Sequence, residues 1–273
     1  MKIKDTSWQI EHWRAPHVEG LELLSASNIT HDYPRHIHEA YGIVMMERGQ
    51  EISRTRAGTF TASSGELMLL NADEAHTSRS INAQYHMMSI PQTVFLRLAS
   101  QATERSVDSF RFLEPVVRDR TLYRSLLNLH LALRESDSSL EQQSSFVSTI
   151  TTLLAHCKPD LSRPVGREVR RIKVVRDYVR EHYAENISLI TLSSVADLTG
   201  FHLVRVFREH VGVPPHEYQT HIRVNKAKVL LRSGYSIADA ALMVGFCDQS
   251  HLSRNFRRIT GMTPGYYASY SIS

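Results

Sequence analysis

The first ninety residues alternate between short apolar runs, such as residues 41–46, and clusters of turn-forming residues. Turns are predicted at Glu47–Gln50, at Ala57–Gly58 and at Ser63–Gly65. A spacing near ten residues is typical of the short strands of a sandwich or barrel. We therefore expect a β-barrel over about residues 20–90.

From about residue 91 to residue 157 the apolar period changes to three and four residues. The repeated positions are Leu122, Leu126, Leu129 and Leu133, followed by Phe146, Ile150 and Leu153. This period predicts amphipathic helices. Their apolar faces either pack against the barrel or form a helix-on-helix dimer surface, and the pattern leaves both uses open.

Residues 158–166 contain two prolines and one glycine and few apolar residues, which predicts a linker. The predicted domains are therefore residues 1–157 and residues 167–273. The predicted class is two-domain α+β: a cupin-like β-barrel with following helices, then an all-α domain with two helix-turn-helix units.

The all-α part contains the pattern of a short helix, a tight turn and a second helix. In the first copy, Leu189–Ala196 is the short helix and Thr199 is a predicted N-cap of the second helix. The copy about 48 residues later has a turn at Gly245–Cys247 and a predicted N-cap at Asp248. Two copies in register favour a DNA-binding domain over a structural helical hairpin.

The second helix of each copy is expected to bury one side and to present the other side to base edges. The expected DNA-contacting residues are Phe201, Val204, Arg205 and Arg208 in the first copy and Gln249, Ser250, Ser253, Arg254 and Arg257 in the second. Arginine can bond guanine in two places, and glutamine can do the same on adenine. The helix expected from Pro214 to about Leu231 spans about 25 Å. That length suits two recognition helices about one DNA turn, about 34 Å, apart.

Charge is distributed unevenly along the chain, although the formal net charge is only +4. Residues 163–273 hold 16 Lys and Arg against 9 Asp and Glu, whereas residues 1–162 hold 16 against 19. A basic C-terminal part fits a polyanion such as double-stranded DNA.

The segments Gly245–Arg258 and Gly261–Pro264 resemble the signature of the AraC/XylS family, and Leu189–Gly212 is similar to its first half. The resemblance implies a transcription regulator, most commonly an activator, with two helix-turn-helix units in successive major grooves. It also implies three binding partners: a small-molecule effector, a second copy of the chain and RNA polymerase. Its base-reading positions fall on Phe201, Val204, Arg205, Gln249, Ser250, Ser253 and Arg254. Asp197 stands where the family usually carries glycine, and Gly200 is expected to weaken the start of its helix.

The N-terminal part carries His36-Ile37-His38, and His76 lies about forty residues further on. On one strand, a His-x-His pair points both rings to the same face. This segment also resembles the cupin barrel found in many AraC-type regulators. The resemblance implies that His36, His38, Tyr41 and His76 line an effector site.

The same three histidines, His36, His38 and His76, could instead hold a metal ion. Metal-binding cupins usually add a glutamate soon after the histidine pair, but this sequence has Tyr41-Gly42-Ile43 there. The sequence therefore favours a hydrogen-bonded histidine cluster over a metal site, and we expect no cofactor. Two other functions stay open: a metal-dependent cupin enzyme, and a DNA-binding protein whose barrel only dimerises.

The remaining features narrow the protein class. There is no apolar run of 18 residues, so no membrane span is expected, and residues 1–5 lack the apolar region of a signal peptide. Two cysteines far apart suit the reducing cytoplasm. Because no catalytic motif stands out, we do not expect an enzyme.

Overall fold

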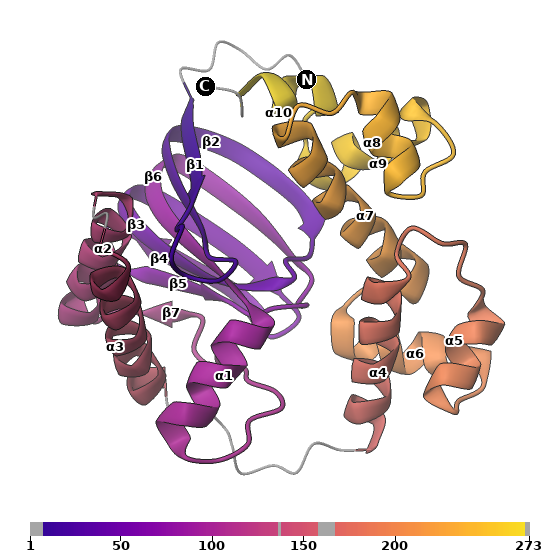
Figure 1. Cartoon of the computed structure of the whole chain (residues 1–273), viewed down its shortest axis with the longest axis horizontal. Helices are drawn as coiled ribbons and strands as arrows, with labels where there is room; N and C mark the ends of the chain where they lie inside the picture. The colour runs from indigo at the N-terminus through magenta and orange to yellow at the C-terminus, as the bar shows by residue number, and fades with distance from the viewer. Residues whose placement is uncertain (1–7, 136–137, 158–166, 271–273) are drawn as a thin grey trace. The chain divides into compact units, whose positions relative to one another are not determined.

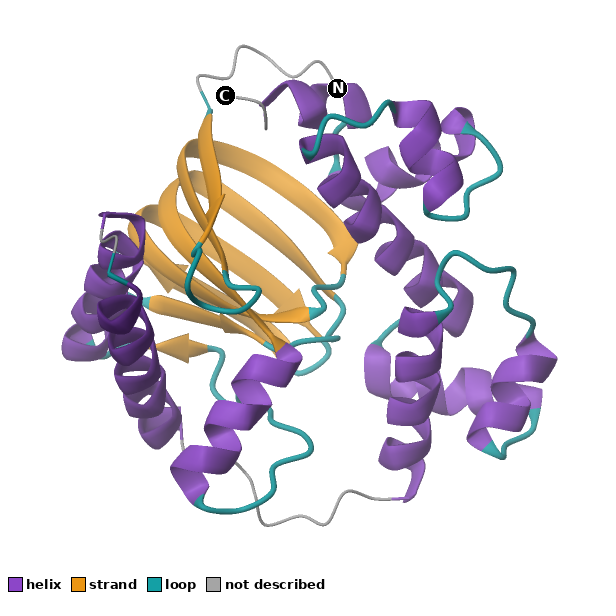
Figure 2. Cartoon of the chain, in the orientation of Figure 1, coloured by secondary structure: helices purple, strands orange, loops and turns teal. Residues whose placement is uncertain are grey.

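The computed structural model describes residues 8–135, 138–157 and 167–270. These residues form two compact units (Figure 1). The first takes in the described parts of 1–32, 38–73 and 78–163, and the second those of 33–37, 74–77 and 164–273. The first unit contains a sheet with helices, and residues 167–270 contain only helices (Figure 2), which confirms the two-domain α+β class. The proposed bounds of the two domains stay predictions, and the predicted linker, 158–166, lies outside the described residues.

The first unit is built around a seven-stranded sheet. Its strands are β1 (Gln9–Arg14), β2 (Glu22–His36), β3 (Ala40–Thr55), β4 (Gly58–Ser63), β5 (Leu67–Leu70), β6 (His76–Pro91) and β7 (Val116–Val117). The order across the sheet is β1-β2-β6-β3-β5-β7, and β4 pairs antiparallel with β3. In this hairpin Thr55 lies opposite Gly58, so the turn consists of Arg56 and Ala57, one residue earlier than the predicted Ala57–Gly58.

Alternation along the strands divides the buried residues between two cores, one on each face of the sheet. On β3, Ile43 and Met45 belong to the first core, whereas Val44 and Met46 belong to the second. The first core also contains residues of the helices α1 (Gln92–Thr103), α2 (Arg120–Glu135) and α3 (Ser139–Cys157). The predicted apolar positions of α2 and α3 are all buried there, which confirms that they pack against the sheet.

Two expectations about the strands are wrong. The strands β2, β3 and β6 are 15 or 16 residues long, rather than short runs spaced near ten residues. The predicted turn at Glu47–Gln50 lies inside β3. Gly49 has a φ of 74° there, and a Cβ atom on it would lie 2.3 Å from the carbonyl oxygen of Asn82. Glycine therefore marks a bend with close backbone contact, not the end of a strand.

Seven helices follow in the described C-terminal residues. They are α4 (Arg167–Glu181), α5 (Leu189–Ala196), α6 (Gly200–Val211), α7 (Pro215–Arg232), α8 (Ile237–Met243), α9 (Gln249–Thr260) and α10 (Pro264–Tyr270). One core is formed by α4, α5, α6 and the start of α7, and another by the end of α7 with α8, α9 and α10. The long helix α7 thus connects two small helical cores, each containing one helix-turn-helix unit.

Candidate DNA-binding surface and histidine cluster

The first helix-turn-helix unit consists of α5 and α6, and side-chain caps set where each helix begins. The hydroxyl of Ser188 accepts a hydrogen bond from the backbone N–H of Thr191, and the hydroxyl of Thr199 accepts one from His202. Such caps satisfy N–H groups that have no partner within the helix. The predicted N-cap at Thr199 is confirmed.

Two residues of this unit depart from the family pattern, and the structure accommodates both. Asp197 has a φ of 50°, so it takes the left-handed conformation that aspartate tolerates, and it forms an ion pair with Arg171 of α4. Gly200 is the first residue of α6, where a Cβ atom would lie 3.2 Å from Leu189. Its small size allows α5 and α6 to approach closely.

The second helix-turn-helix unit consists of α8 and α9. Asp248 caps α9, since its carboxylate accepts a 2.7 Å hydrogen bond from the N–H of His251. Residues 244–248 separate α8 from α9, whereas only residues 197–199 separate α5 from α6, and α9 begins 49 residues after α6. Gly245 has a φ of 87° in this turn, and a Cβ atom there would lie 2.2 Å from the carbonyl oxygen of Ala184.

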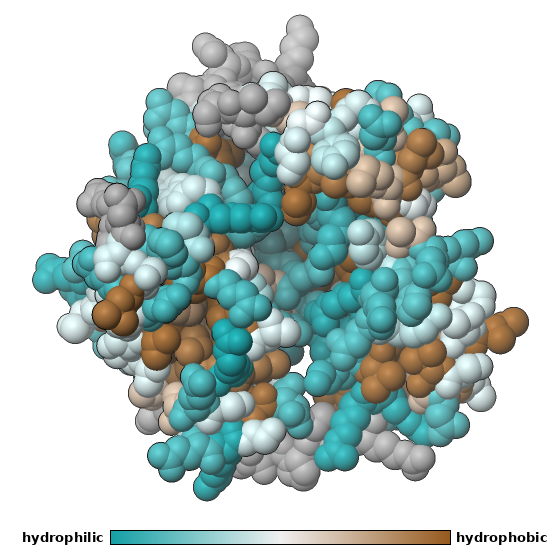
Figure 3. Space-filling view, viewed as in Figure 1, coloured by the Kyte–Doolittle hydropathy of each residue, from teal (hydrophilic) through white to brown (hydrophobic). Residues whose placement is uncertain are grey.

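The predicted DNA-contacting residues lie on the outer sides of α6 and α9. The inner sides are formed by Leu203 and Phe207 on α6, and by Leu252 and Phe256 on α9, all of them buried. The exposed predicted residues are Phe201, Arg205, Arg208, Gln249, Ser250, Arg254 and Arg257, while Val204 and Ser253 are half-buried. Figure 3 shows apolar surface among hydrophilic side chains over α5 and α6, where Phe201 is 85 % exposed. The contacts of the predicted residues of α6 and α9 with DNA stay a prediction.

The arginines on these helices differ in their intramolecular partners. Arg205 donates to Glu209 at 2.9 Å, and Arg258 donates to Glu217 of α7 at 3.4 Å. Arg254 makes no ion pair within the part of the chain that the structure describes. Arg254 is therefore available to an incoming acceptor without breaking an ion pair, unlike Arg258.

Several contacts that position the helices were not foreseen from the sequence. His202 of α6 lies 3.2 Å from Glu168 of α4, and Arg223 of α7 donates to the carbonyl oxygens of Tyr183 and Glu185. These pairs join residues 34 to 40 positions apart in the chain. No local pattern could have revealed them, because each depends on how the helices pack.

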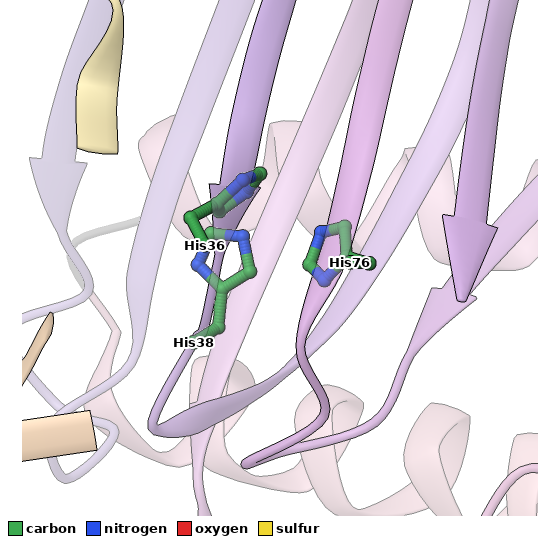
Figure 4. A group of neighbouring side chains, drawn as sticks. All are labelled: His36, His38 and His76. Atoms are coloured by element: carbon green, nitrogen blue, oxygen red, sulfur yellow. The ribbon is translucent and has the colours of Figure 1, made fainter. Parts of the chain in front are cut away.

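The predicted histidine cluster forms at the ends of two strands (Figure 4). One nitrogen of each of His36, His38 and His76 lies within 4.8 Å of the others. The rings of His36 and His76 are 4.3 Å apart between centroids. The expectation that the pair shares one strand is wrong, because β2 ends at His36 and His38 lies beyond it. The chain bends after β2 and still brings both rings to one place.

Backbone carbonyl groups fix the tautomers of two of these rings. The Nδ1 atom of His36 lies 2.8 Å from the carbonyl oxygen of Pro34, and that of His76 lies 3.2 Å from the carbonyl oxygen of Glu74. Since a carbonyl oxygen only accepts, both Nδ1 atoms carry the proton. Burial lowers the pKa of His76, because it disfavours the charged form of the ring.

Tyr41 does not join the histidines. It is 3 % exposed, its ring stacks on Phe95, and its hydroxyl donates a 2.8 Å hydrogen bond to the carbonyl oxygen of Phe110. All three residues belong to the core beneath the helices of the first unit. Packing and this hydrogen bond give Tyr41 a structural role, and its place in an effector site stays a prediction.

No single helix in the described residues is long and apolar enough to cross a membrane. The bent pair α5 and α6 meets the criteria of length and composition together, with a 78° angle between the two helices. These two helices are the first helix-turn-helix unit.

Two family models match the chain. The AraC-like ligand binding domain matches residues 20–150, and a helix-turn-helix domain matches residues 192–269. The HTH-type transcriptional regulator YbfI of Bacillus subtilis, itself described as uncharacterized, is 29 % identical over 241 residues, which is 87 % of either chain. The HTH-type transcriptional activator RhaS of an Enterobacter species is 25 % identical over 252 residues, covering 85 % of this chain and 86 % of that one.

Solved structures agree on the fold. A structure of ToxT from Vibrio cholerae superposes with a TM-score of 0.68 over 98 % of this chain and 100 % of its own, at 13 % identity. The fold and the matched domains define a two-domain DNA-binding regulator with a ligand-binding domain. The chain belongs to the AraC family of transcriptional regulators.

Proposed function

We propose that this regulator places α6 and α9 in two successive segments of the major groove. The observation that carries the proposal is the matched construction of the two units. Each has a capped second helix whose inner side is buried and whose outer side presents arginines, together with Phe201 on α6 and with Gln249 and Ser250 on α9. The 18 residues of α7 span about 27 Å. This length supports a separation near one turn of DNA, about 34 Å.

We further propose that a small molecule bound by the sheet domain controls this binding, in the neighbourhood of His36, His38 and His76. One solved ToxT structure contains an unsaturated fatty acid. Because the relatives are transcriptional regulators, we propose regulation, not catalysis.

The remaining parts of the proposal concern assembly and mode of action. Leu131, Leu140 and Val147 are exposed apolar residues on α2 and α3, and they support a homodimer formed through these helices. One relative is named as an activator. We propose activation through contact with RNA polymerase, in the cytoplasm, where bacterial DNA lies.

Selection of bound sequences from a random duplex pool at about 0.15 M salt tests the proposal. We expect enrichment of a composite site with two short half-sites about 10 bp apart. The same selection with residues 167–273 alone separates a need for effector from a lack of sequence reading. If neither protein enriches any sequence, specific DNA recognition by these helices is wrong.

Arg254→Ala is expected to lower affinity for the selected site by about 1–3 kcal/mol and to relax the preference at one base pair. The reason is that Arg254 is exposed on the outer side of α9 and makes no ion pair within the described residues. Fluorescence anisotropy with the selected duplex and with its single-base variants measures both effects. Arg258→Ala is the matched control, because Arg258 is directed to Glu217. Unchanged affinity of Arg254→Ala would show that the assigned outer side of α9 is wrong.

A further inference from the structure

The cluster of His36, His38 and His76 has the composition of a metal site. We propose that these three residues bind one divalent transition-metal ion, and that its binding changes the affinity of the protein for DNA. The first part stands on the geometry of the cluster alone. The second part rests on the proposed function, because it concerns DNA binding through α6.

The donor set selects the kind of ion. All three donors are imidazole nitrogens, and the group contains no carboxylate or thiolate. Imidazole suits zinc, copper, nickel and iron, whereas calcium and magnesium prefer oxygen. Three protein ligands also leave one position of a tetrahedral zinc ion for water or for an effector.

The tautomers leave one nitrogen lone pair on each of two rings of the cluster. Because the Nδ1–H groups of His36 and His76 donate to the carbonyl oxygens of Pro34 and Glu74, the Nε2 atom of each neutral ring carries the lone pair. A hydrogen bond from the second ring nitrogen is the usual outer contact of a metal-ligating histidine, and it fixes the ring orientation. Both contacts are already present here.

The remaining adjustment is small. Nitrogen atoms bound to a tetrahedral zinc ion lie about 3.4 Å apart, since each Zn–N bond is about 2.0–2.1 Å. The donor atoms of the cluster lie within 4.8 Å of one another. Each separation therefore has to shorten by about 1.4 Å at most, from 4.8 Å to about 3.4 Å.

Within the second compact unit, the two segments that carry His36 and His76 are hydrogen-bonded to the C-terminal end of α6. Arg35 donates to the carbonyl oxygen of Gly212, and the N–H of Ala75 donates to that of Val211. Ile37 and Ala75 are part of the core that contains α6. An ion that draws the two histidines together therefore acts on the residues that hold the C-terminal end of this recognition helix.

The first test is zinc binding to the chelator-treated full chain, measured by equilibrium dialysis and by calorimetry. We expect one zinc equivalent that His36→Ala, His38→Ala and His76→Ala each lose, and a rise in Tm of roughly 5 °C at 100-fold excess over Kd. His216→Ala is the control, because His216 is exposed on α7 and lies outside the cluster. Since buried His76 also affects folding, the half-buried His38 provides the milder variant. Equal zinc stoichiometry and affinity in the wild type and His38→Ala would overturn the site.

The second test measures binding to the selected duplex with and without zinc. We expect the affinity of the wild type to change about fivefold or more, and that of His38→Ala to stay constant. Equal affinity of the zinc-loaded and zinc-free wild type would overturn the coupling. Specific DNA binding by the zinc-free protein would support the proposed function whatever zinc does. Failure of DNA selection leaves the zinc-binding test unaffected.

Discussion

Phe256→Ala is expected to lower the free energy of unfolding of the helical domain by about 3–5 kcal/mol. Phe256 is fully buried on the inner side of α9, and its ring packs edge-to-face against Tyr267 at 5.4 Å. Truncation removes the buried ring and leaves a cavity that the surrounding helices fill only in part. Urea unfolding of the full chain, followed by the far-ultraviolet circular dichroism of the helices, measures the loss.

Phe201→Ala makes the matched control, because it removes the same ring from an exposed position of α6. We expect it to change the free energy of unfolding by about 0.5 kcal/mol or less. It should instead weaken binding to the selected duplex, since Phe201 is a predicted contact of a thymine methyl group. A loss below about 1 kcal/mol for Phe256→Ala would show that this ring does not seat α9.

The helix-turn-helix units were predictable from the sequence because their determinants are local. A cap such as Thr199 or Asp248 bonds to an N–H group only three residues away, so the sequence order contains the whole interaction. The buried positions of α6 and α9 likewise repeat with the period of the helix. The difference in length between the two turns, residues 197–199 against residues 244–248, was the detail that the approximate repeat did not reveal.

The sheet was harder to predict because its determinants are distant in sequence. The bend at Gly49 was mistaken for a turn, since only the approach of the strand containing Asn82 shows that β3 continues. The meeting of His36 with His76 was predicted from residue type and family resemblance. Sequence proximity to His38 did not reveal that the Tyr41 side chain packs in the core beneath α1, α2 and α3.

Acidification from pH 7 to pH 5 is expected to remove about 2 kcal/mol of stability through His221 alone. His221 lies on α7, is 1 % exposed, and neither ring nitrogen has a hydrogen-bond partner among the described residues. Burial, together with the charges of Arg258 and Lys228, lowers the pKa of His221 from 6.5 to about 3. The folded protein therefore keeps this ring neutral across the whole range.

The direction of this pH dependence follows from how the folded and the unfolded chain bind a proton. Below pH 6.5 the unfolded chain binds a proton on His221, whereas the folded chain does so only near pH 3. Protonation thus favours the unfolded state, and the stability present above pH 6.5 is lost as the pH falls toward 3. His130 on α2 adds a similar loss in the first unit, because burial lowers its pKa to about 4.

His221→Leu isolates this contribution. At pH 7 the variant should be at least as stable as the wild type, because an apolar side chain replaces two buried nitrogens without partners. At pH 5 it should exceed the wild type by about 2 kcal/mol, since the unfolded variant no longer gains the proton. Urea unfolding at several pH values measures how the free energy of unfolding of each protein changes with pH. His216→Leu, at an exposed position of the same helix, should keep the wild-type slope of the free energy of unfolding against pH. Identical slopes for His221→Leu and the wild type would mean that His221 already accepts a proton in the folded helical core.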